Sequence, residues 1–241
     1  MRIKCLFTYQ QYMDAPAAIT QGNDVIIAID VLRATSSIIT ALANGAKAVY
    51  AVKEIAAALA LKEKHPEAIL VGERGGLIID GFDCGNSPLE FGPQTVAGKT
   101  LISCTTNGTA AIEISAKAES RLFLGAIINS DAVALKTLQT LPGDILILCS
   151  GTEGKISMDD IIGAGSIIHR LLELAGPQTL DDGAKIAHLL YQRYAGNLLQ
   201  ALEEAVHGKK LTGVGRYEDL VYCAQENLVP YVPERQGDIL R

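Results

Sequence analysis

The sequence predicts an α/β fold of three layers, α/β/α, with a mainly parallel or mixed sheet between its helices. One pattern occurs at three places: an apolar, β-branched run, then a loop of small polar residues, then an amphipathic or Ala-rich segment. Continuous apolar strands that alternate with helices are typical of a parallel sheet with both faces covered. With 49% hydrophobic residues, the chain of 241 residues can also bury a sizeable core. We expect one domain over residues 1–241, and the repeated pattern leaves room for two similar, intertwined halves.

The apolar runs define the strands, and the spacing of apolar residues between them defines the helices. Strands are expected over residues 25–29, 48–52, 68–72, 100–104, 121–124 and 145–149. Helices are expected over residues 35–44, 54–64, 110–118, 158–175 and 183–207. Asn44-Gly45 ends the first helix because a left-handed residue is favoured there, and Pro66 cannot continue the second. Gly208 is the expected stop of the last helix.

The composition excludes several classes of protein. The chain has 27 acidic and 21 basic side chains and a net charge of −6, so no basic stripe is available to follow a nucleic acid. Its five cysteines include no Cys-x-x-Cys pair, which fits reduced thiols and argues against a zinc knuckle or a disulfide framework. No apolar run reaches the roughly 20 residues of a membrane span, and polar residues follow Phe7 too soon for a signal peptide. We therefore expect a cytoplasmic protein that binds neither nucleic acid nor membrane, with a homodimer as one compatible oligomeric state.

The first loop that could carry chemistry follows the strand over residues 25–29. In an open α/β sheet, ligands bind outside the carboxyl ends of the strands, where helix N-termini offer N–H groups to an oxyanion. Asp30 can hold a hard cation such as Mg²⁺ or act as a nucleophile, while Arg33 holds phosphate oxygens by paired hydrogen bonds. Thr35 and Ser36 add hydroxyl groups. The alternative is an Asp30–Arg33 pair that only orders the loop, with Ser36 as a plain helix cap.

The second loop, Thr105-Thr106-Asn107-Gly108-Thr109, is the more specific signal. Asn-Gly is a favoured hairpin turn, but the residues that follow have a helical pattern, so a strand-to-helix turn fits better. Its hydroxyl groups and its glycine suit close backbone approach to an oxyanion. We expect Gly108→Val to block that approach and to leave the fold intact.

A turn-rich stretch after the strand over residues 68–72 supplies further candidates. Glu73 and Arg74 lie near the end of this strand, and Asn86 and Ser87 follow in an irregular segment. A long segment of this kind is unusual unless it binds something. The alternative is a solvated loop in which Asn86 and Pro88 set the turns.

The third loop brings acidic residues to the start of the helix over residues 158–175. Asp159 and Asp160 complement the positive end of the helix dipole, and together with Glu153 they are open candidates for metal ligands. The four histidines lie on or beside expected helices rather than in a loop at a strand end. We interpret them as structural or surface residues.

Several of these segments, taken in chain order, resemble the motifs of one known family. They are Asp30–Ser36, Gly72–Gly75, Gly81–Pro88 and Thr105–Thr109, followed by Asn129 and the stretch Gly151–Gly154. The chain resembles the 2-phosphosulfolactate phosphatases, the ComB family of the coenzyme M pathway, over nearly its whole length. The resemblance implies a three-layer fold and a Mg²⁺-dependent acid phosphatase that hydrolyses 2-phospho-3-sulfolactate to 3-sulfolactate and phosphate.

Motifs and resemblance together give one candidate site for a small anionic substrate. The expected catalytic residues are Asp30 and Arg33, and the expected Mg²⁺ ligands are Asp30, Glu73 and Glu153. The expected phosphate- and substrate-binding residues are Thr35, Ser36, Arg74, Asn86, Ser87, Thr105, Thr106, Asn107, Gly108 and Thr109.

The sequence departs from the family pattern at some positions, and it is also compatible with other functions. Cys84 and Cys104 replace other residues of the family pattern, and the tail over residues 211–220 is only loosely similar. A variant tail would alter substrate choice if it folds over the pocket. The alternatives are an anion-binding or regulatory module without turnover, and a phosphatase of another small acidic ester; the Asp30 carboxylate favours catalysis. An aspartyl-phosphate enzyme of the haloacid dehalogenase type is disfavoured, because Leu32 stands where that family has a second aspartate.

Overall fold

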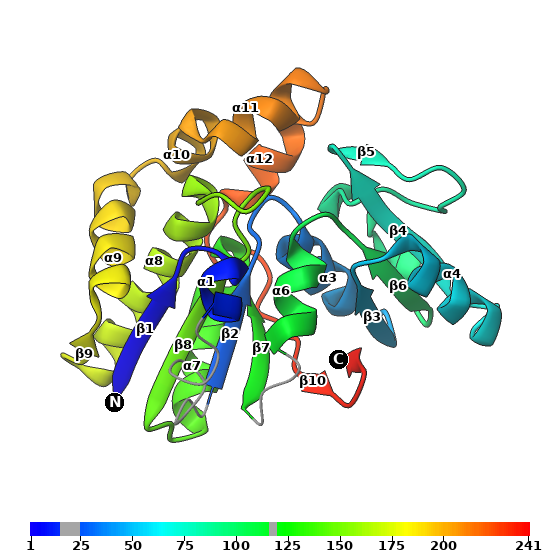
Figure 1. The fold of residues 1–241 in the computed structure, drawn as a ribbon. Coiled ribbons are helices and arrows are strands. Elements are labelled where there is room, and N and C mark those ends of the chain that lie inside the picture. Colours follow the sequence, from blue (N-terminus) through cyan, green and yellow to red (C-terminus); the bar gives the residue numbers. More distant parts are fainter. Residues whose placement is uncertain (15–24, 116–119) are drawn as a thin grey trace.

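The computed structural model describes residues 1–14, 25–115 and 120–241, and the strands of this part of the chain form two sheets (Figure 1). Sheet A is parallel throughout and has the strand order β7-β2-β8-β1-β9. Its strands are β1 (Arg2–Leu6), β2 (Val25–Ile29), β7 (Arg121–Gly125), β8 (Asp144–Cys149) and β9 (Thr179–Leu180).

Sheet B is mixed and has the order β10-β11-β3-β6-β4-β5. Its strands are β3 (Ala48–Val52), β4 (Ile69–Arg74), β5 (Leu77–Ile78), β6 (Thr100–Cys104), β10 (Arg235–Gln236) and β11 (Ile239–Leu240). The central strands β3, β6 and β4 run parallel, and the short outer strands pair antiparallel. The sequence predicts β2, β7 and β8 of sheet A and β3, β4 and β6 of sheet B, but not β1 and β9. It also does not show that the strands divide into two sheets.

Helices cover both faces of sheet A, which confirms the three-layer α/β fold class. One face carries α7 (Ser130–Gln139), α8 (Met158–Ala175) and α9 (Asp182–Tyr194), and the other carries α1 (Tyr9–Asp14), α3 (Ala34–Ala43) and α6 (Gly108–Ser115). Successive residues of β2 point to opposite faces: Ile27 packs with α8 and α9, and Ile26 packs with α3. Because both faces are covered, β2 and β8 are buried along their whole length.

The remaining helices surround sheet B and the top of the molecule. In chain order they are α4 (Ile55–Lys64), η1 (Pro88–Glu90), α5 (Pro93–Val96), η2 (Ile127–Asn129), α10 (Leu198–Glu204), α11 (Val206–Gly213) and α12 (Tyr217–Cys223). Helices α10 to α12 lie above the carboxyl ends of sheet A and reach toward β4 and β5 of sheet B (Figure 1).

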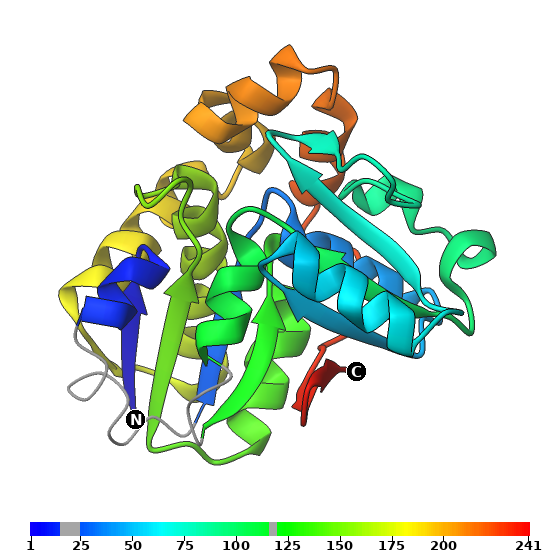
Figure 2. The same cartoon turned by 45° about the vertical axis from the view of Figure 1, so that its right-hand side comes forward.

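The C-terminal segment connects the two sheets (Figure 1 and Figure 2). The N–H group of Leu124 in β7 donates to the Pro233 carbonyl at 3.0 Å, and the next residue, Glu234, bridges to Phe123. The chain then forms the β10–β11 hairpin, where Leu240 pairs with Val49 of β3. One segment therefore pairs with an edge strand of each sheet.

One expected element is wrong, and its neighbourhood explains why. The helix expected over residues 183–207 is divided into α9, α10 and the start of α11, because the chain turns at Ala195–Asn197 and the Asn197 side chain accepts from the Gln200 N–H at 3.2 Å. Gly208 lies inside α11 and does not stop it; a Cβ there would come within 1.8 Å of the Leu202 carbonyl oxygen. The glycine permits tight packing of α11 on α10. Residues 116–118 of the expected helix over 110–118 lie outside the described residues.

The structure bears on two expectations from the sequence, which concern membrane spans and the state of the cysteines. Over residues 1–14, 25–115 and 120–241, no helix combines the length and the hydropathy that crossing a bilayer requires. All five cysteines lie in the described residues and are free thiols, as the absence of paired spacing predicted.

Candidate active site

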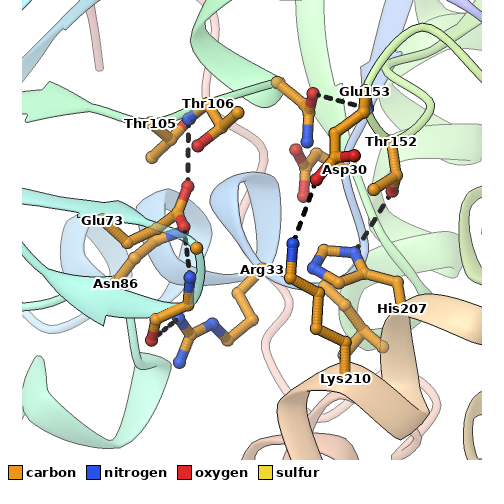
Figure 3. A pocket seen from close by; sticks show the side chains of 14 residues that line it. Asp30, Arg33, Glu73, Asn86, Thr105, Thr106, Thr152, Glu153, His207 and Lys210 are labelled. Carbon is orange, nitrogen blue, oxygen red and sulfur yellow. Dashed lines mark hydrogen bonds and ion pairs between the residues drawn. The ribbon is translucent and has the colours of Figure 1, made fainter. Parts of the chain in front are cut away.

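A pocket lies between the two sheets, at the carboxyl ends of their parallel strands, and α11 borders it with His207 and Lys210 (Figure 3). It contains about 440 Å³ of space, its open mouth included. The residues around it come from segments far apart in the sequence and are Asp30, Leu32, Arg33, Glu73, Gly75, Gly76, Asn86, Thr105, Thr106, Asn107, Thr152, Glu153, His207 and Lys210. Much of the predicted site is therefore brought together, along with residues that the sequence did not indicate.

Asp30 is the buried carboxylate of the pocket. It follows the last residue of β2, and its side chain accepts a hydrogen bond from the N–H group of Ala34 at 3.0 Å, which fixes it against the start of α3. Burial raises the pKa of Asp30 to about 7; the negative charges of Asp159 and Glu73 act in the same direction, against the Ala34 N–H and the Arg33 charge. A carboxyl group held this way titrates near neutral pH, so it can serve as a ligand, a nucleophile or a proton carrier.

Arg33 does not form an ion pair with Asp30, contrary to the simple loop-ordering alternative. Its guanidinium donates to Asp219 of α12 at 2.5 Å and to the Gly76 carbonyl at 3.0 Å, and the Arg33 and Asp219 side chains are each only 2% exposed. Ser87 donates to the other Asp219 oxygen at 2.5 Å. Asp219 thus holds Arg33 at the pocket wall, while Ser87 lies behind it and does not line the pocket.

Glu73 joins the loops of sheet B around the pocket. Its two oxygens accept from the N–H groups of Thr106 at 3.0 Å and Gly76 at 2.8 Å. Burial alone would raise the pKa of Glu73, but these hydrogen bonds and the Arg33 charge outweigh it and lower that pKa. Glu73 is therefore a fixed anion whose two oxygens already have partners.

The loop over residues 105–109 is a strand-to-helix turn, as predicted. Thr105 and Thr109 bond to each other: the Thr109 N–H donates to Thr105 Oγ1 at 3.2 Å, and Thr109 Oγ1 donates to the Thr105 carbonyl at 2.9 Å. Thr105, Thr106 and Asn107 line the pocket, whereas Gly108 and Thr109 form the first turn of α6 behind it.

Gly108 packs against Asp30, so the expectation that Gly108→Val leaves the fold intact is wrong. A Cβ at position 108 would lie 2.4 Å from the Ala34 Cβ and 2.6 Å from Asp30 Oδ2. A larger side chain must displace α3 or Asp30. Position 108 therefore cannot separate loss of activity from loss of folding.

Three other predicted substrate-binding residues point away from the pocket. Thr35 donates to the carbonyls of Asp30 and Gly125, each at 2.9 Å, and Ser36 donates to the Val31 carbonyl at 2.8 Å. These bonds order the loop after β2, and Ser36 does not cap α3. Arg74 donates to the carbonyls of Glu73 and Lys53, each at 2.8 Å, so it supports sheet B. In this structure, none of the three side chains lies where a ligand in the pocket could reach it.

The opposite wall carries basic groups from α11 that the sequence did not indicate. Lys210 forms an ion pair with Glu153 at 3.1 Å, and His207 lies 3.4 Å from the Thr152 hydroxyl (Figure 3). His207, which the sequence analysis interprets as a structural or surface residue, thus lines the pocket. No strand end precedes these residues, and their helical spacing alone does not distinguish them from a solvated face.

Asp160 connects two of the loops that shape the pocket. Its oxygens accept from the N–H groups of Val31 and Gly151, each at 2.9 Å. Burial and the neighbouring carboxylates Asp159 and Asp30 raise the pKa of Asp160 well above its ordinary value. Because both Asp160 oxygens are engaged, it holds the loops after β2 and β8 together.

Asp30 alone is a better candidate for a Mg²⁺ ligand than the predicted group of Asp30, Glu73 and Glu153. Among the described residues, no three Asp, Glu, His or Cys side chains are grouped closely enough to hold a metal. Mg²⁺ commonly keeps several waters and uses one or two carboxylates plus substrate phosphates, so such a group is not required. Glu153 is paired with Lys210, whereas Asp30 Oδ2 lies beside the first turn of α6 at the pocket wall. Asp30 is therefore the carboxylate that could hold a cation, while Glu73, whose oxygens already accept two N–H groups, lies in the same pocket.

The comparisons with known proteins give the family. A profile described as 2-phosphosulpholactate phosphatase matches residues 13–238. The chain belongs to the 2-phosphosulfolactate phosphatase family. It is 41% identical to the "Probable 2-phosphosulfolactate phosphatase" of Deinococcus radiodurans over 210 residues, which are 87% of each chain. Proteins of the same name from Caldanaerobacter subterraneus subsp. tengcongensis and Cyanothece sp. are 40% and 37% identical, over 98% of this chain and 97% of theirs.

The matched span of the 2-phosphosulfolactate phosphatase family contains every residue of the pocket, together with Asp219 behind it. It also contains the tail over residues 211–220. In the structure this tail forms the end of α11 and the start of α12, where Leu211 and Val214 pack on Gly76 at the pocket edge. This tail thus borders the site.

Proposed function

We propose that this chain hydrolyses 2-phospho-3-sulfolactate to 3-sulfolactate and inorganic phosphate with Mg²⁺ as cofactor. One observation carries the proposal: a single pocket combines a buried carboxylate, Asp30, with basic groups from both sides of the molecule, Arg33 and Lys210. A binding site for an anion requires only donors. A carboxylate among them suits phosphoryl transfer, where it can hold a cation or attack phosphorus.

The charge of this substrate matches the pocket. The substrate carries a phosphate, a sulfonate and a carboxylate, so it needs several donors arranged around it. Arg33 lies near Asp30 and is the candidate for the phosphate oxygens, while Lys210 lies on the opposite wall and is the candidate for a second acidic group. The net charge of −6 does not oppose this, because positive potential can be focused locally.

Asp30, with Glu73 beside it, would hold Mg²⁺, and the ion would supply positive charge to the phosphate oxygens when bound. Asp30 must then be ionised, and cation binding would favour that form in spite of its burial. Arg33, held by Asp219, would neutralise the charge that develops on the phosphate oxygens. The proposal includes the role that the resemblance implies, in coenzyme M biosynthesis or a related pathway.

Phosphate release from a panel of esters tests the proposal. The panel contains 2-phospho-3-sulfolactate, 2-phosphomalate with a carboxylate in place of the sulfonate, and 2-phospholactate with neither. We expect the highest kcat/KM for the sulfonated ester, loss of turnover after exhaustive chelation, and recovery with added Mg²⁺.

Each other outcome has a distinct meaning. Undiminished turnover after chelation removes the metal from the proposal, and higher kcat/KM for another ester replaces the substrate. Stabilisation by the esters against heat without any phosphate release identifies an anion-binding module.

A further inference from the structure

His207 lies between the pocket and a buried carboxylate. Its Nδ1 is 3.4 Å from Thr152 Oγ1 and 3.7 Å from Asp159 Oδ2. The ring lines the pocket, and Figure 3 shows its second nitrogen turned toward the pocket interior. One nitrogen therefore faces the protein and the other faces the space that a substrate would occupy.

Asp159 has an unsatisfied oxygen on the side of His207. Its side chain is 1% exposed; Oδ1 accepts from the Ser157 hydroxyl at 2.5 Å, and Oδ2 has no hydrogen-bond partner among the described residues. A buried carboxylate oxygen without a partner is costly. Hydrogen bonds of catalytic groups are often long before substrate binds and shorten afterwards. A small rotation of the imidazole would bring Nδ1 within hydrogen-bond distance of Oδ2.

From this geometry, and resting on the proposed function, we infer that His207 is the general acid of the reaction and that Asp159 is its positioning residue. The ester P–O bond breaks, and its electron pair goes to the sulfolactate oxygen, which takes the proton from His207 Nε2. Water supplies the oxygen of the new P–O bond, and the proton that this water loses returns to His207 through solvent. The products are the alcohol and inorganic phosphate.

The other groups of the pocket suit this role less well. Arg33 keeps its proton at any relevant pH, and Lys210 is an ammonium paired with Glu153. Glu73 accepts two N–H groups that favour its ionised form. Asp30 would hold the cation in the proposed function, which leaves water as the nucleophile. An imidazole can donate a proton from one ring nitrogen while the protein holds the other.

Several charged groups surround the imidazole. Asp159 of α8 and Lys210 of α11 lie beside it, and Asp30, Glu73 and Arg33 line the same pocket. Glu153 and Lys155 of the loop after β8, and Glu204 of α10, share the neighbouring surface. Asp159 is the buried carboxylate of this set whose Oδ2 lies 3.7 Å from the ring Nδ1.

The first experiment uses His207→Gln with the best ester of the panel. Gln keeps a polar group near Thr152 but cannot act as an acid. We expect kcat to fall by about 10²–10⁴-fold, with little change in melting temperature. The basic limb of the kcat–pH profile, where the wild-type acid loses its proton, should disappear. His65→Gln is the matched control, since His65 lies beyond α4 beside Tyr50, outside the pocket, and it should change neither quantity.

The second experiment separates positioning from mere support. Asp159→Asn removes the negative charge beside His207, so the basic limb should move to lower pH by about one unit. A purely structural role would lower stability and leave the limb in place, and that result would overturn the assignment of Asp159. If His207→Gln does not fold, the shift of the basic limb in Asp159→Asn tests the inference in its place.

The outcomes distinguish this inference from the proposed function. An active wild type whose His207→Gln variant keeps its kcat and its basic limb overturns the inference alone. A wild type that releases phosphate from no ester overturns the inference and the proposed function together.

Discussion

Asp30 is buried, has a raised pKa and lines the pocket. Replacing it should change both activity and stability, and the two effects can be measured separately. Asp30→Asn keeps the shape of the side chain and removes its charge. We expect kcat to fall by at least about 100-fold, measured as phosphate release at saturating ester. Asp182→Asn, at an exposed position of α9, is the control and should leave kcat unchanged.

The stability of the wild type relative to this variant should depend on pH in a defined direction. The folded chain holds the Asp30 proton more tightly than the unfolded chain, because the pKa rises from 3.8 to about 7. The stability that this gives is present below about pH 4 and is lost as the pH rises through about 7. The loss amounts to up to about 4 kcal/mol, at about 1.4 kcal/mol per pH unit. Wild type should therefore lose stability relative to Asp30→Asn in urea unfolding between pH 5 and pH 8; parallel curves would contradict the raised pKa.

Asp219 should matter more for stability than an exposed acid does. Asp219→Asn leaves the buried Arg33 guanidinium without its anion, which should cost about 3–5 kcal/mol of unfolding free energy. Lys185→Gln breaks the exposed Lys185–Asp182 pair and should cost less than about 1 kcal/mol. Urea unfolding of both variants tests this, and equal losses would show that Arg33 does not need its buried partner.

Among the elements, α8 and α9 approach each other closely at Gly165. A Cβ there would lie 2.1 Å from the Ala187 carbonyl oxygen, so Gly165→Ala must push the helices apart. We expect a loss of about 1–3 kcal/mol of unfolding free energy. Gly213→Ala, at the end of α11 with no atom within 4 Å of the added Cβ, should be neutral or stabilising by up to about 1 kcal/mol. Equal stability of the two variants would mean that α8 and α9 separate freely.

The elements that the sequence predicted are those whose signals are local. Strands β2, β6 and β8 are apolar runs buried on both faces, and α8 has the predicted bounds. Strand β1 was missed because its residues alternate between polar and apolar and form no continuous apolar run, the pattern by which the other strands were predicted. The break after α9 was missed because apolar residues keep their helical spacing across Ala195–Asn197.

The residues of the candidate site also divide into those with a local sequence signal and those without one. Asp30, Glu73 and Thr105 to Asn107 were found because carboxylates and hydroxyls at strand ends are a local pattern. His207, Lys210 and Asp219 come from helices that fold over the pocket, and only the tertiary structure brings them to it. Arg74, Thr35 and Ser36 have suitable chemistry, but their side chains bond to nearby carbonyls.

On the scale of the whole molecule, the C-terminal segment should determine how firmly the sheets are held together. Deleting residues 234–241 removes the Glu234 ion pairs to Arg121 and Lys136 and the pairing of Leu240 with β3. Loss of the buried Leu240 side chain alone should cost about 2 kcal/mol. We expect urea unfolding to show at least this loss and KM to rise, because the pocket lies between the sheets. Asp238→Ala, at the exposed hairpin tip, should change neither, and unchanged KM after the deletion would show that the sheets keep their spacing without it.

The Arg33–Asp219 ion pair also determines when the pocket can first exist. The two residues are 186 positions apart, which a ribosome covers in about 10–40 seconds at about 5–20 residues per second. Until Asp219 has been synthesised, Arg33 lacks its buried anion, and α12 cannot close the pocket. A growing chain therefore remains unable to assemble the site while most of its parts are already made. For much of this interval, until β8 has been synthesised, the edges of β1 and β2 that pair with it also stay unpaired.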